Sequence, residues 1–180
     1  GMNRLAVLVG GMLAVAIAAA APDVALKDLN GRERNVNEFI GRGKWVALTV
    51  WAHDCHVCAA EIHEMAEFHR AHKDKDAVVL GVSIDGYAKR KQAQAFVERH
   101  KLPFTNLIAE PMQAIIVKFG AGELVGTPTT YLYDPKGRLA AMTVGPVSRR
   151  DIESYIERNP ASVDTAHAAL RTDSTAKAAD

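Results

Sequence analysis

The chain has 180 residues, of which 48% are hydrophobic and 24% are charged, and this composition suits one compact domain rather than a disordered or collagen-like chain. Lysine and arginine number 22 against 21 aspartate and glutamate, so the net charge of +1 argues against a nucleic-acid surface. Two cysteines are too few for a disulfide-stapled scaffold, a four-cysteine zinc site or an iron–sulfur cluster.

Residues 1–21 have the pattern of a targeting segment. Gly1 precedes Met2 and is treated as an added residue, and Arg4 then supplies a short positive start. The apolar run 5–21 is at the low edge of the length that a membrane-spanning helix needs. We expect a signal peptide that is cleaved after Ala20, with an uncleaved N-terminal membrane anchor as the alternative. Either way the protein would be periplasmic or secreted, where paired cysteines can form a disulfide.

Residues 22–158 alternate short β runs with helical stretches, which predicts one α/β domain. The predicted strands are 24–29, 45–51, 77–84, 129–133 and 138–144. The predicted helices are 55–72, 87–100, 112–119 and 148–158. The order is a β-hairpin, a βαβ unit, a helix, a second hairpin and a last helix, so we expect a mixed central sheet with helices on both faces. Residues 159–180 are rich in Ala, Ser, Thr and Asp, which predicts a mobile tail.

The two cysteines form a C-x-x-C motif, Cys55-His56-Val57-Cys58, directly after a buried strand and at the start of a helix. Free backbone N–H groups and the positive end of the helix dipole stabilise a thiolate at that place. We therefore predict that Cys55, at the outermost position, is the exposed nucleophile. Cys58 lies one turn further in and is predicted to be the resolving thiol.

The residues next to the motif have opposite effects on the stability of a thiolate at Cys55. His56, when protonated, would favour a thiolate at Cys55. Asp54 would disfavour that thiolate, unless it caps the helix and directs its carboxylate to backbone N–H groups. Glu61, one turn beyond Cys58, is a candidate proton acceptor for the buried thiol, and a solvated helix glutamate is the alternative.

Three segments together resemble a known family. The run from Trp51 to Glu61 resembles the W-A-x-x-C-x-x-C-x-x-E signature of the thioredoxin-like fold. It is most similar to the exported TlpA-like thiol–disulfide oxidoreductases, which are related to the AhpC/TSA and Redoxin proteins. Residues 125–137 resemble the family's G-x-P-T-T segment with its following D-x-x-G turn, and residues 28–31 match its D-L-N-G hairpin. The resemblance covers about residues 23–158 and implies a three-layer αβα sandwich with a mixed sheet and an N-terminal β-hairpin.

The resemblance also implies roles for particular residues. Cys55 and Cys58 would form a redox-active disulfide. Pro128 would be a cis-proline that faces this disulfide, and the backbone of Thr127 would pair with the substrate chain. Trp51 would cover one side of the active site and contact substrate, with a plain core role as the alternative.

Two positions depart from the family pattern. Asp54 stands where the family usually has an aromatic residue, and Val57 stands where it usually has proline. Both positions help to set the reduction potential. The resemblance therefore implies the dithiol–disulfide reaction, but it does not fix the direction of electron flow.

The sequence leaves three alternatives to a thiol–disulfide oxidoreductase. A zinc or copper site could be built from the two cysteines and the nearby histidines His53, His56 and His63. A peroxiredoxin needs a proline and a threonine close before its cysteine, and no proline lies between Pro22 and Cys55. A purely structural disulfide would close a loop of only four residues and gain little from the cross-link.

We therefore predict a monomeric thiol–disulfide oxidoreductase that needs no cofactor, no metal and no nucleic acid. It would exchange the Cys55–Cys58 disulfide with protein thiol or disulfide substrates, more as a reductase than as a thiol oxidase, because proteins of this type mostly act as reductases. Some of them act in cytochrome c maturation. A membrane electron donor would recycle it, since the periplasm has no thiol buffer.

Overall fold

A computed structural model describes residues 21–116, 119 and 122–160 of the chain. Most of the predicted signal segment and residues 161–180 of the predicted tail therefore lie outside the described residues. So does part of the predicted helix 112–119. Among the helices that are described, none combines the length and the apolar character needed to cross a bilayer.

The chain forms seven strands, four α-helices and two short 3-10 helices within these residues. The strands are β1 (Ala25–Asp28), β2 (Glu33–Asn35), β3 (Trp45–Trp51), β4 (Ala77–Ser83), β5 (Thr105–Ile108), β6 (Thr129–Tyr133) and β7 (Leu139–Val144). The helices are η1 (Val36–Glu38), α1 (His56–His72), η2 (Tyr87–Lys89), α2 (Arg90–Arg99), α3 (Pro111–Ile116) and α4 (Arg149–Arg158).

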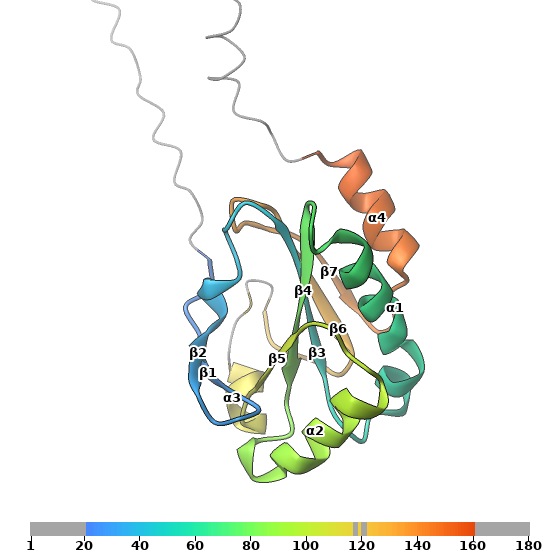
Figure 1. The fold of residues 1–180 in the computed structure, drawn as a ribbon. Coiled ribbons are helices and arrows are strands. Elements are labelled where there is room, and N and C mark those ends of the chain that lie inside the picture. The colour runs from blue at the N-terminus through green and yellow to red at the C-terminus, as the bar shows by residue number, and fades with distance from the viewer. Residues whose placement is uncertain (1–20, 117–118, 120–121, 161–180) are drawn as a thin grey trace, which may run out of the picture.

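All seven strands join one mixed sheet in the order β2-β1-β5-β4-β3-β6-β7 (Figure 1). β3, β4 and β5 run parallel to one another, whereas β1 and β6 pair antiparallel on either side of this group. β3 is buried along its whole length because strands flank both of its edges and other layers cover both of its faces. The parallel strands end at the lower edge in Figure 1, where α1 and η2 begin.

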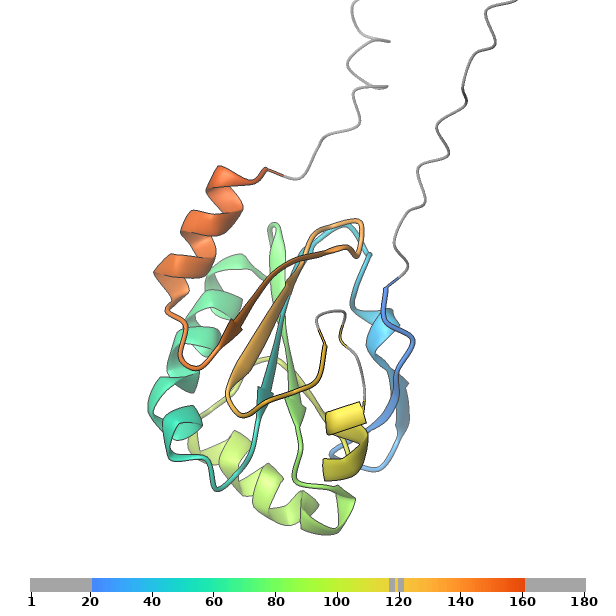
Figure 2. The same cartoon turned by 180° about the vertical axis from the view of Figure 1, so that it is seen from behind.

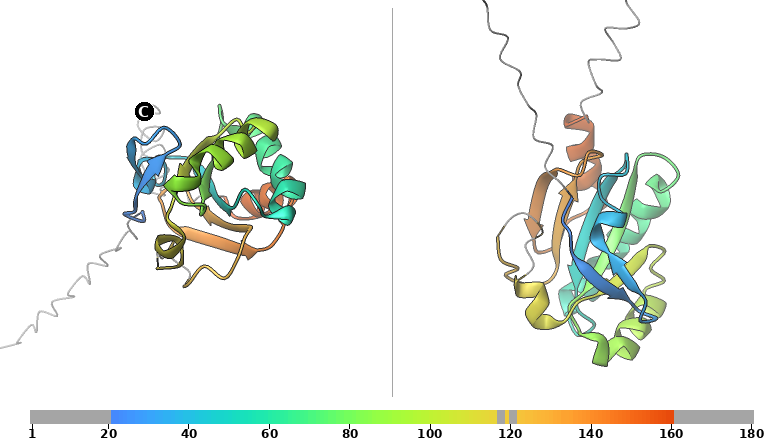
Figure 3. Two further views of the ribbon diagram at one scale, coloured as in Figure 1. Left: turned by 90° about the horizontal axis from the view of Figure 1, so that it is seen from below. Right: turned by 90° about the vertical axis from the view of Figure 1, so that its left-hand side faces the viewer.

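Each face of the sheet has its own hydrophobic core. One core packs β3 and β4 side chains against α1, α2 and α4, with Phe68, Phe96 and Ile152 contributed by these helices. The other core lies beneath α3, η1 and the loop before β6, and it includes Val36 and Leu124. Figure 2 shows α3 in front of the sheet, and Figure 3 shows it apart from α1 and α2. The predicted mixed sheet with helices on both faces is confirmed.

The structure adds one strand that the sequence pattern did not predict. β5 has only four residues, and it lies between β4, from which a helix separates it in the chain, and β1, which is about 80 residues earlier. Its pairing partners are supplied by distant segments, so neither its length nor its surroundings produce a local signal. This strand carries Asn106, which supports the candidate site described below.

The two hairpins close on turns of the same kind. Asp28 accepts hydrogen bonds from the main-chain N–H groups of Asn30 and Arg32, at 2.8 and 3.0 Å. Asp134 accepts the equivalent pair from Lys136 and Arg138, at 3.0 and 2.9 Å. In each turn a glycine with positive φ precedes the arginine (Gly31, φ 87°; Gly137, φ 86°), a conformation that glycine adopts at little cost.

Candidate active site

The two cysteines are joined in a disulfide where β3 meets α1. Their Cα atoms are 5.2 Å apart. Cys55 is the N-cap of α1, and its Sγ accepts a hydrogen bond from the N–H of Cys58 at 3.1 Å. The alternative in which Asp54 caps this helix is not what the structure shows. The helix begins at His56, so the extended cap position falls on Cys55 and leaves Asp54 exposed in the preceding turn.

The two sulfur-bearing residues differ in exposure. Cys58 is 1% exposed and belongs to the core formed with α1. Cys55 is partly exposed, and His56 and Val57 between them are exposed. An incoming group can therefore approach Cys55 from solvent, whereas Cys58 is reached only through the disulfide. This asymmetry is what an attacking thiol and a resolving thiol require.

The segment before β6 lies against Cys55. The Thr127–Pro128 peptide bond is cis, and the carbonyl oxygen of Thr127 lies 3.6 Å from Cys55 Sγ. Two hydrogen bonds hold this segment: Thr129 Oγ1 donates to the carbonyl of Gly126 at 2.7 Å, and Gly145 N–H donates to the carbonyl of Pro128 at 2.8 Å. The structure thus brings together the C-x-x-C and threonine–proline motifs, which are about 70 residues apart in the sequence.

Trp51 is a core residue at the end of β3. Its side chain is fully buried and stacks on Phe96 with ring centroids 4.5 Å apart. Its indole N–H donates to Oδ1 of Asn106 at 3.0 Å, and the amide of Asn106 donates in turn to the carbonyl of Phe104 at 2.9 Å. Asn106 was missed in the sequence because it reaches Trp51 only through the order of the strands.

A small cavity lies behind the disulfide. Cys58, Glu61, Trp51 and Pro128 all contribute to its wall, and its volume is about 20 Å³. That is room for about one water molecule. Glu61 is half-buried at this position, and it lines the same cavity as the buried cysteine.

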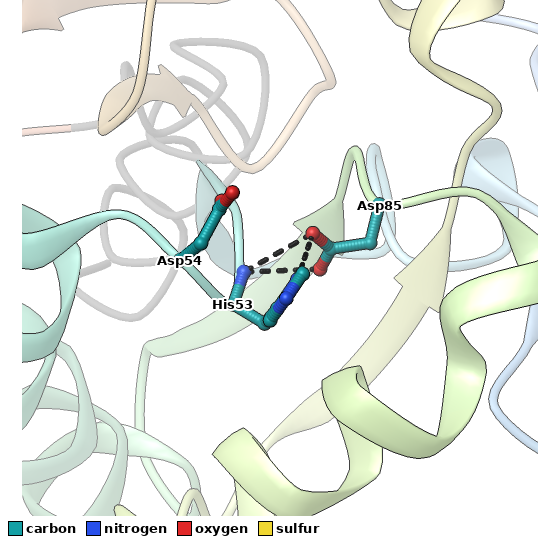
Figure 4. Close-up of side chains that lie close together, drawn as sticks. All are labelled: His53, Asp54 and Asp85. Atoms are coloured by element: carbon teal, nitrogen blue, oxygen red, sulfur yellow. Dashed lines mark hydrogen bonds and ion pairs between the residues drawn. The ribbon is translucent and has the colours of Figure 1, made fainter.

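A second polar group supports the turn that carries Cys55. Asp85 follows β4, and its side chain is only 4% exposed. Its carboxylate accepts the main-chain N–H of His53 at 3.0 Å, contacts His53 Nδ1 at 2.6 Å and accepts the hydroxyl of Ser83 at 2.6 Å. Figure 4 shows the imidazole of His53 facing Asp85, with Asp54 on the neighbouring part of the turn. Asp85 and Ser83 were also missed, and their only signal is a polar pair at the end of a buried strand.

The arrangement gives little support for a metal centre. His53, Asp54 and Asp85 bring potential ligand atoms within 4.8 Å of one another. However, Nδ1 of His53 is already hydrogen-bonded to Asp85. Each cysteine is bonded to the other, and His63 contacts the carbonyl of its own helix at Ala60. The metal-binding alternative is therefore not favoured.

Comparison with known proteins gives a consistent result. Residues 17–142 match the AhpC/TSA family. The chain is 30% identical over 144 residues to the thiol-disulfide oxidoreductase ResA of Geobacillus thermodenitrificans (strain NG80-2), covering 80% of this chain and 78% of that protein. It is also 30% identical to the thioredoxin-like protein YneN of Bacillus subtilis (strain 168), covering 76% of each.

Solved structures give the same fold. A DsbF homologue from Corynebacterium diphtheriae superposes with a TM-score of 0.67 at 23% identity, covering 78% of this chain and 86% of that one. A structure described as a putative thiol:disulfide interchange protein DsbE from Chlorobium tepidum superposes with a TM-score of 0.64 at 26% identity, covering 77% and 94%. These neighbours and the sheet order establish the thioredoxin-like αβα sandwich.

Proposed function

Because the chain belongs to the AhpC/TSA family and is a TlpA-like thiol–disulfide oxidoreductase, we propose that it acts as an exported reductase of protein disulfides through Cys55 and Cys58. One observation carries this proposal. Cys55 is partly exposed beside the carbonyl of Thr127, and Cys58 is buried directly behind it. A thiol oxidase of the same fold is the second candidate, because Asp54 and Val57 occupy positions that help to set the redox poise.

The reaction proceeds in two exchanges. In the reduced protein, the Cys55 thiolate attacks one sulfur of a substrate disulfide, forms a mixed disulfide and releases the first substrate thiolate. The Cys58 thiolate then attacks Cys55 Sγ and releases the second substrate thiolate. Two electrons pass to the substrate, and the Cys55–Cys58 disulfide is the oxidised product. The reverse sequence would oxidise a dithiol.

The helix start assists the first step. The N–H of Cys58 that donates to Cys55 Sγ in the disulfide is also in place to donate to a thiolate at that sulfur. The positive end of the α1 dipole adds to this effect. His56, exposed at the first position of α1, would add positive charge when it is protonated.

The second step needs a proton acceptor for a thiol that water reaches poorly. We assign this role to Glu61, because it lines the same small cavity as Cys58. A water molecule in that cavity could relay the proton between the two side chains. Trp51 lines the cavity and is fully buried, so we assign it to the cavity wall rather than to direct contact with substrate.

The segment before β6 is the proposed platform for the substrate chain. The carbonyl of Thr127 lies beside the attacking sulfur, and Pro128 contributes no N–H of its own. Two apolar side chains near this segment are exposed. Val57, in the C-x-x-C motif, is 45% exposed, and Val125, just before the segment, is 76% exposed. A polypeptide could thus bind through its backbone at Thr127 and through apolar side chains at the two valines.

The cellular setting remains part of the proposal. We infer that residues 1–21 are a signal peptide or anchor, that residues 159–180 are a tail, and that the domain works as a monomer in the periplasm or outside the cell. A membrane electron donor would return the disulfide to the dithiol. One solved relative at 25% identity is a secreted thiol-disulfide isomerase from Corynebacterium glutamicum, and this similarity supports an exported protein. Cytochrome c maturation is one process in which such a reductase could act.

The reduction potential of the Cys55–Cys58 couple tests the direction. We expect a value near about −270 mV, the range of thioredoxin, when the protein is equilibrated with redox buffers of known potential. A value near about −120 mV, the range of a strong oxidant, would overturn the reductase assignment and favour the thiol oxidase. The Cys58→Ser variant, which cannot form the internal disulfide, is the control.

A further inference from the structure

The turn that carries Cys55 is tied to the end of β4 by one buried carboxylate. Cys55 N–H donates to the carbonyl of Ala52 at 3.2 Å, which closes a four-residue turn around His53 and Asp54. Asp85 accepts both the main-chain N–H and the ring nitrogen Nδ1 of His53 within this turn. The position of the attacking sulfur therefore depends on a contact across 32 residues of sequence.

The geometry shows which ring nitrogen of His53 carries a hydrogen. Nδ1 lies 2.6 Å from the Asp85 carboxylate, and a carboxylate only accepts hydrogen bonds, so Nδ1 is a donor in the neutral imidazole and in the imidazolium alike. Ser83 also donates to this carboxylate, and Asp85 N–H returns a bond to the same hydroxyl at 3.1 Å. The carboxylate of Asp85 is thus surrounded by hydrogen-bond donors, and among these donors the imidazole of His53 can also carry a positive charge when both of its nitrogens are protonated.

A second carboxylate adds to the negative charge at this turn. Asp54 directly precedes Cys55, and the potential ligand atoms of His53, Asp54 and Asp85 lie within 4.8 Å of one another. Titratable groups also occur on the neighbouring segments: His56 at the start of α1, and Glu110, whose carboxylate accepts the N–H of the first residue of η2. Two acids beside the nucleophile would oppose its thiolate unless something offsets them.

We propose that His53, as an imidazolium paired with Asp85, is a positioning residue that offsets part of the negative charge of Asp54 and Asp85 and so favours the Cys55 thiolate beside two acids. Asp85 fixes the imidazole by its Nδ1 and fixes the turn by the main-chain N–H of the same residue. The inference rests on the assignment of Cys55 as the attacking thiol. It explains how this chain accommodates an aspartate at the position directly before that cysteine.

The test uses variants in a Cys58→Ala background, where Cys55 is the single thiol. The rate of alkylation of Cys55 by iodoacetamide is followed by mass spectrometry from about pH 5 to about pH 9, because alkylation reports the thiolate. His53→Ala leaves both acids without their partner, so alkylation at neutral pH should slow by about threefold or more. Asp85→Asn removes one acid and keeps an acceptor for the turn, so alkylation should become faster.

These opposite signs separate charge compensation from a purely structural clamp. Asp85→Asn keeps an acceptor for the main-chain N–H of His53, so a clamp alone would predict no acceleration of alkylation in that variant. The double variant His53→Ala/Asp85→Asn should return toward the parent rate, because both the base and its partner acid are gone. His63→Ala removes an exposed histidine from α1 and should leave the profile unchanged.

Every outcome decides the question. Opposite shifts with recovery in the double variant support the proposal, and shifts of one sign, or no shift in either variant, overturn it. If circular dichroism shows that His53→Ala does not fold, Asp85→Asn alone decides, since it must accelerate alkylation.

In the protein with both cysteines, the reduction potential should fall in His53→Ala and rise in Asp85→Asn. A Cys58→Ala parent that is not alkylated at Cys55 would instead refute the assignment of the nucleophile.

Discussion

In the two hairpin turns and in the active-site turn, a carboxylate accepts hydrogen bonds from main-chain N–H groups, but the sequence separation between the partners differs greatly. At Asp28 and Asp134, a carboxylate accepts main-chain N–H groups two and four residues further along the chain. At Asp85, a carboxylate accepts the main-chain N–H of a residue that lies 32 positions earlier. The hairpin turns are closed by their own residues, whereas the active-site turn is held by the arrangement of the sheet.

This difference predicts that the hairpin turns contribute to the stability of the fold, whereas the long-range contacts contribute to the geometry of the active site. A change in a hairpin turn should weaken the fold locally and leave the disulfide chemistry unchanged. A change in the long-range contacts around Trp51, Asn106 and Asp85 should affect the geometry of the site. The predictions below test whether the two regions can be separated in this way.

The largest effect is expected beneath the active site, at Gly81 on β4. A Cβ at this position would overlap the side chain of Asn106, which cannot move without losing its bond to the Trp51 indole. Gly81→Ala should lower the free energy of unfolding by about 2–3 kcal/mol, measured by urea denaturation. Gly126→Ala is the matched control, because nothing lies within 4 Å of its added Cβ. Equal stability of the two variants would mean that Asn106 is not fixed by its contacts.

A smaller effect is expected at Asp134 in the second hairpin. Its replacement by alanine removes the acceptor for two main-chain N–H groups and for the Arg138 guanidinium, which it binds at 2.7 Å. We expect Asp134→Ala to lose about 1–2 kcal/mol of unfolding free energy. The rate of thiol–disulfide exchange should stay at the wild-type value. A loss of exchange rate at a temperature where the variant is fully folded would show that the hairpin and the site are not separable.

The smallest effect concerns the pH dependence contributed by Asp28. Burial opposes ionisation of this carboxyl, but hydrogen bonds from Arg32 and Asn30 and the charge of Arg32 together hold its pKa below the ordinary value. Asp28 therefore stabilises the fold above the ordinary aspartate pKa of about 4, and this contribution is lost as the pH falls through the lower folded value.

The Asp28→Asn variant should accordingly lose about 1 kcal/mol or less at neutral pH. It should also show a flatter fall in stability than the wild-type protein below about pH 4. Urea denaturation at a series of pH values measures both. A variant whose stability falls with pH as steeply as that of the wild-type protein would contradict the assigned sign.

The sequence predicted best those parts of the fold whose causes are local. The D-x-x-G turns, the apolar run of β3 and the C-x-x-C motif at the start of α1 each carry their signal within a few residues. The mixed sheet followed from the order of these segments. β5 was missed because four residues between distant partners give no period to detect.

The candidate site shows the same limit. Cys55, Cys58 and Pro128 lie in recognisable motifs, and the structure brings them together. Asp85 and Asn106 have no motif, because each acquires its partner only when β4 or β5 is placed in the sheet. Whether Asp54 caps α1 was left open by the sequence, and the structure decides it, since the cap position falls one residue later, on Cys55 itself.

Trapping of mixed disulfides tests the central claim most directly, namely that Cys55 attacks and Cys58 resolves. The Cys58→Ala and Cys55→Ala variants are each reduced and mixed with a disulfide-containing protein, and the covalent adducts are mapped by mass spectrometry. Adducts should accumulate on Cys55 in the first variant and be scarce on Cys58 in the second, because Cys58 is 1% exposed. Adducts that form equally well on Cys58 would contradict the account.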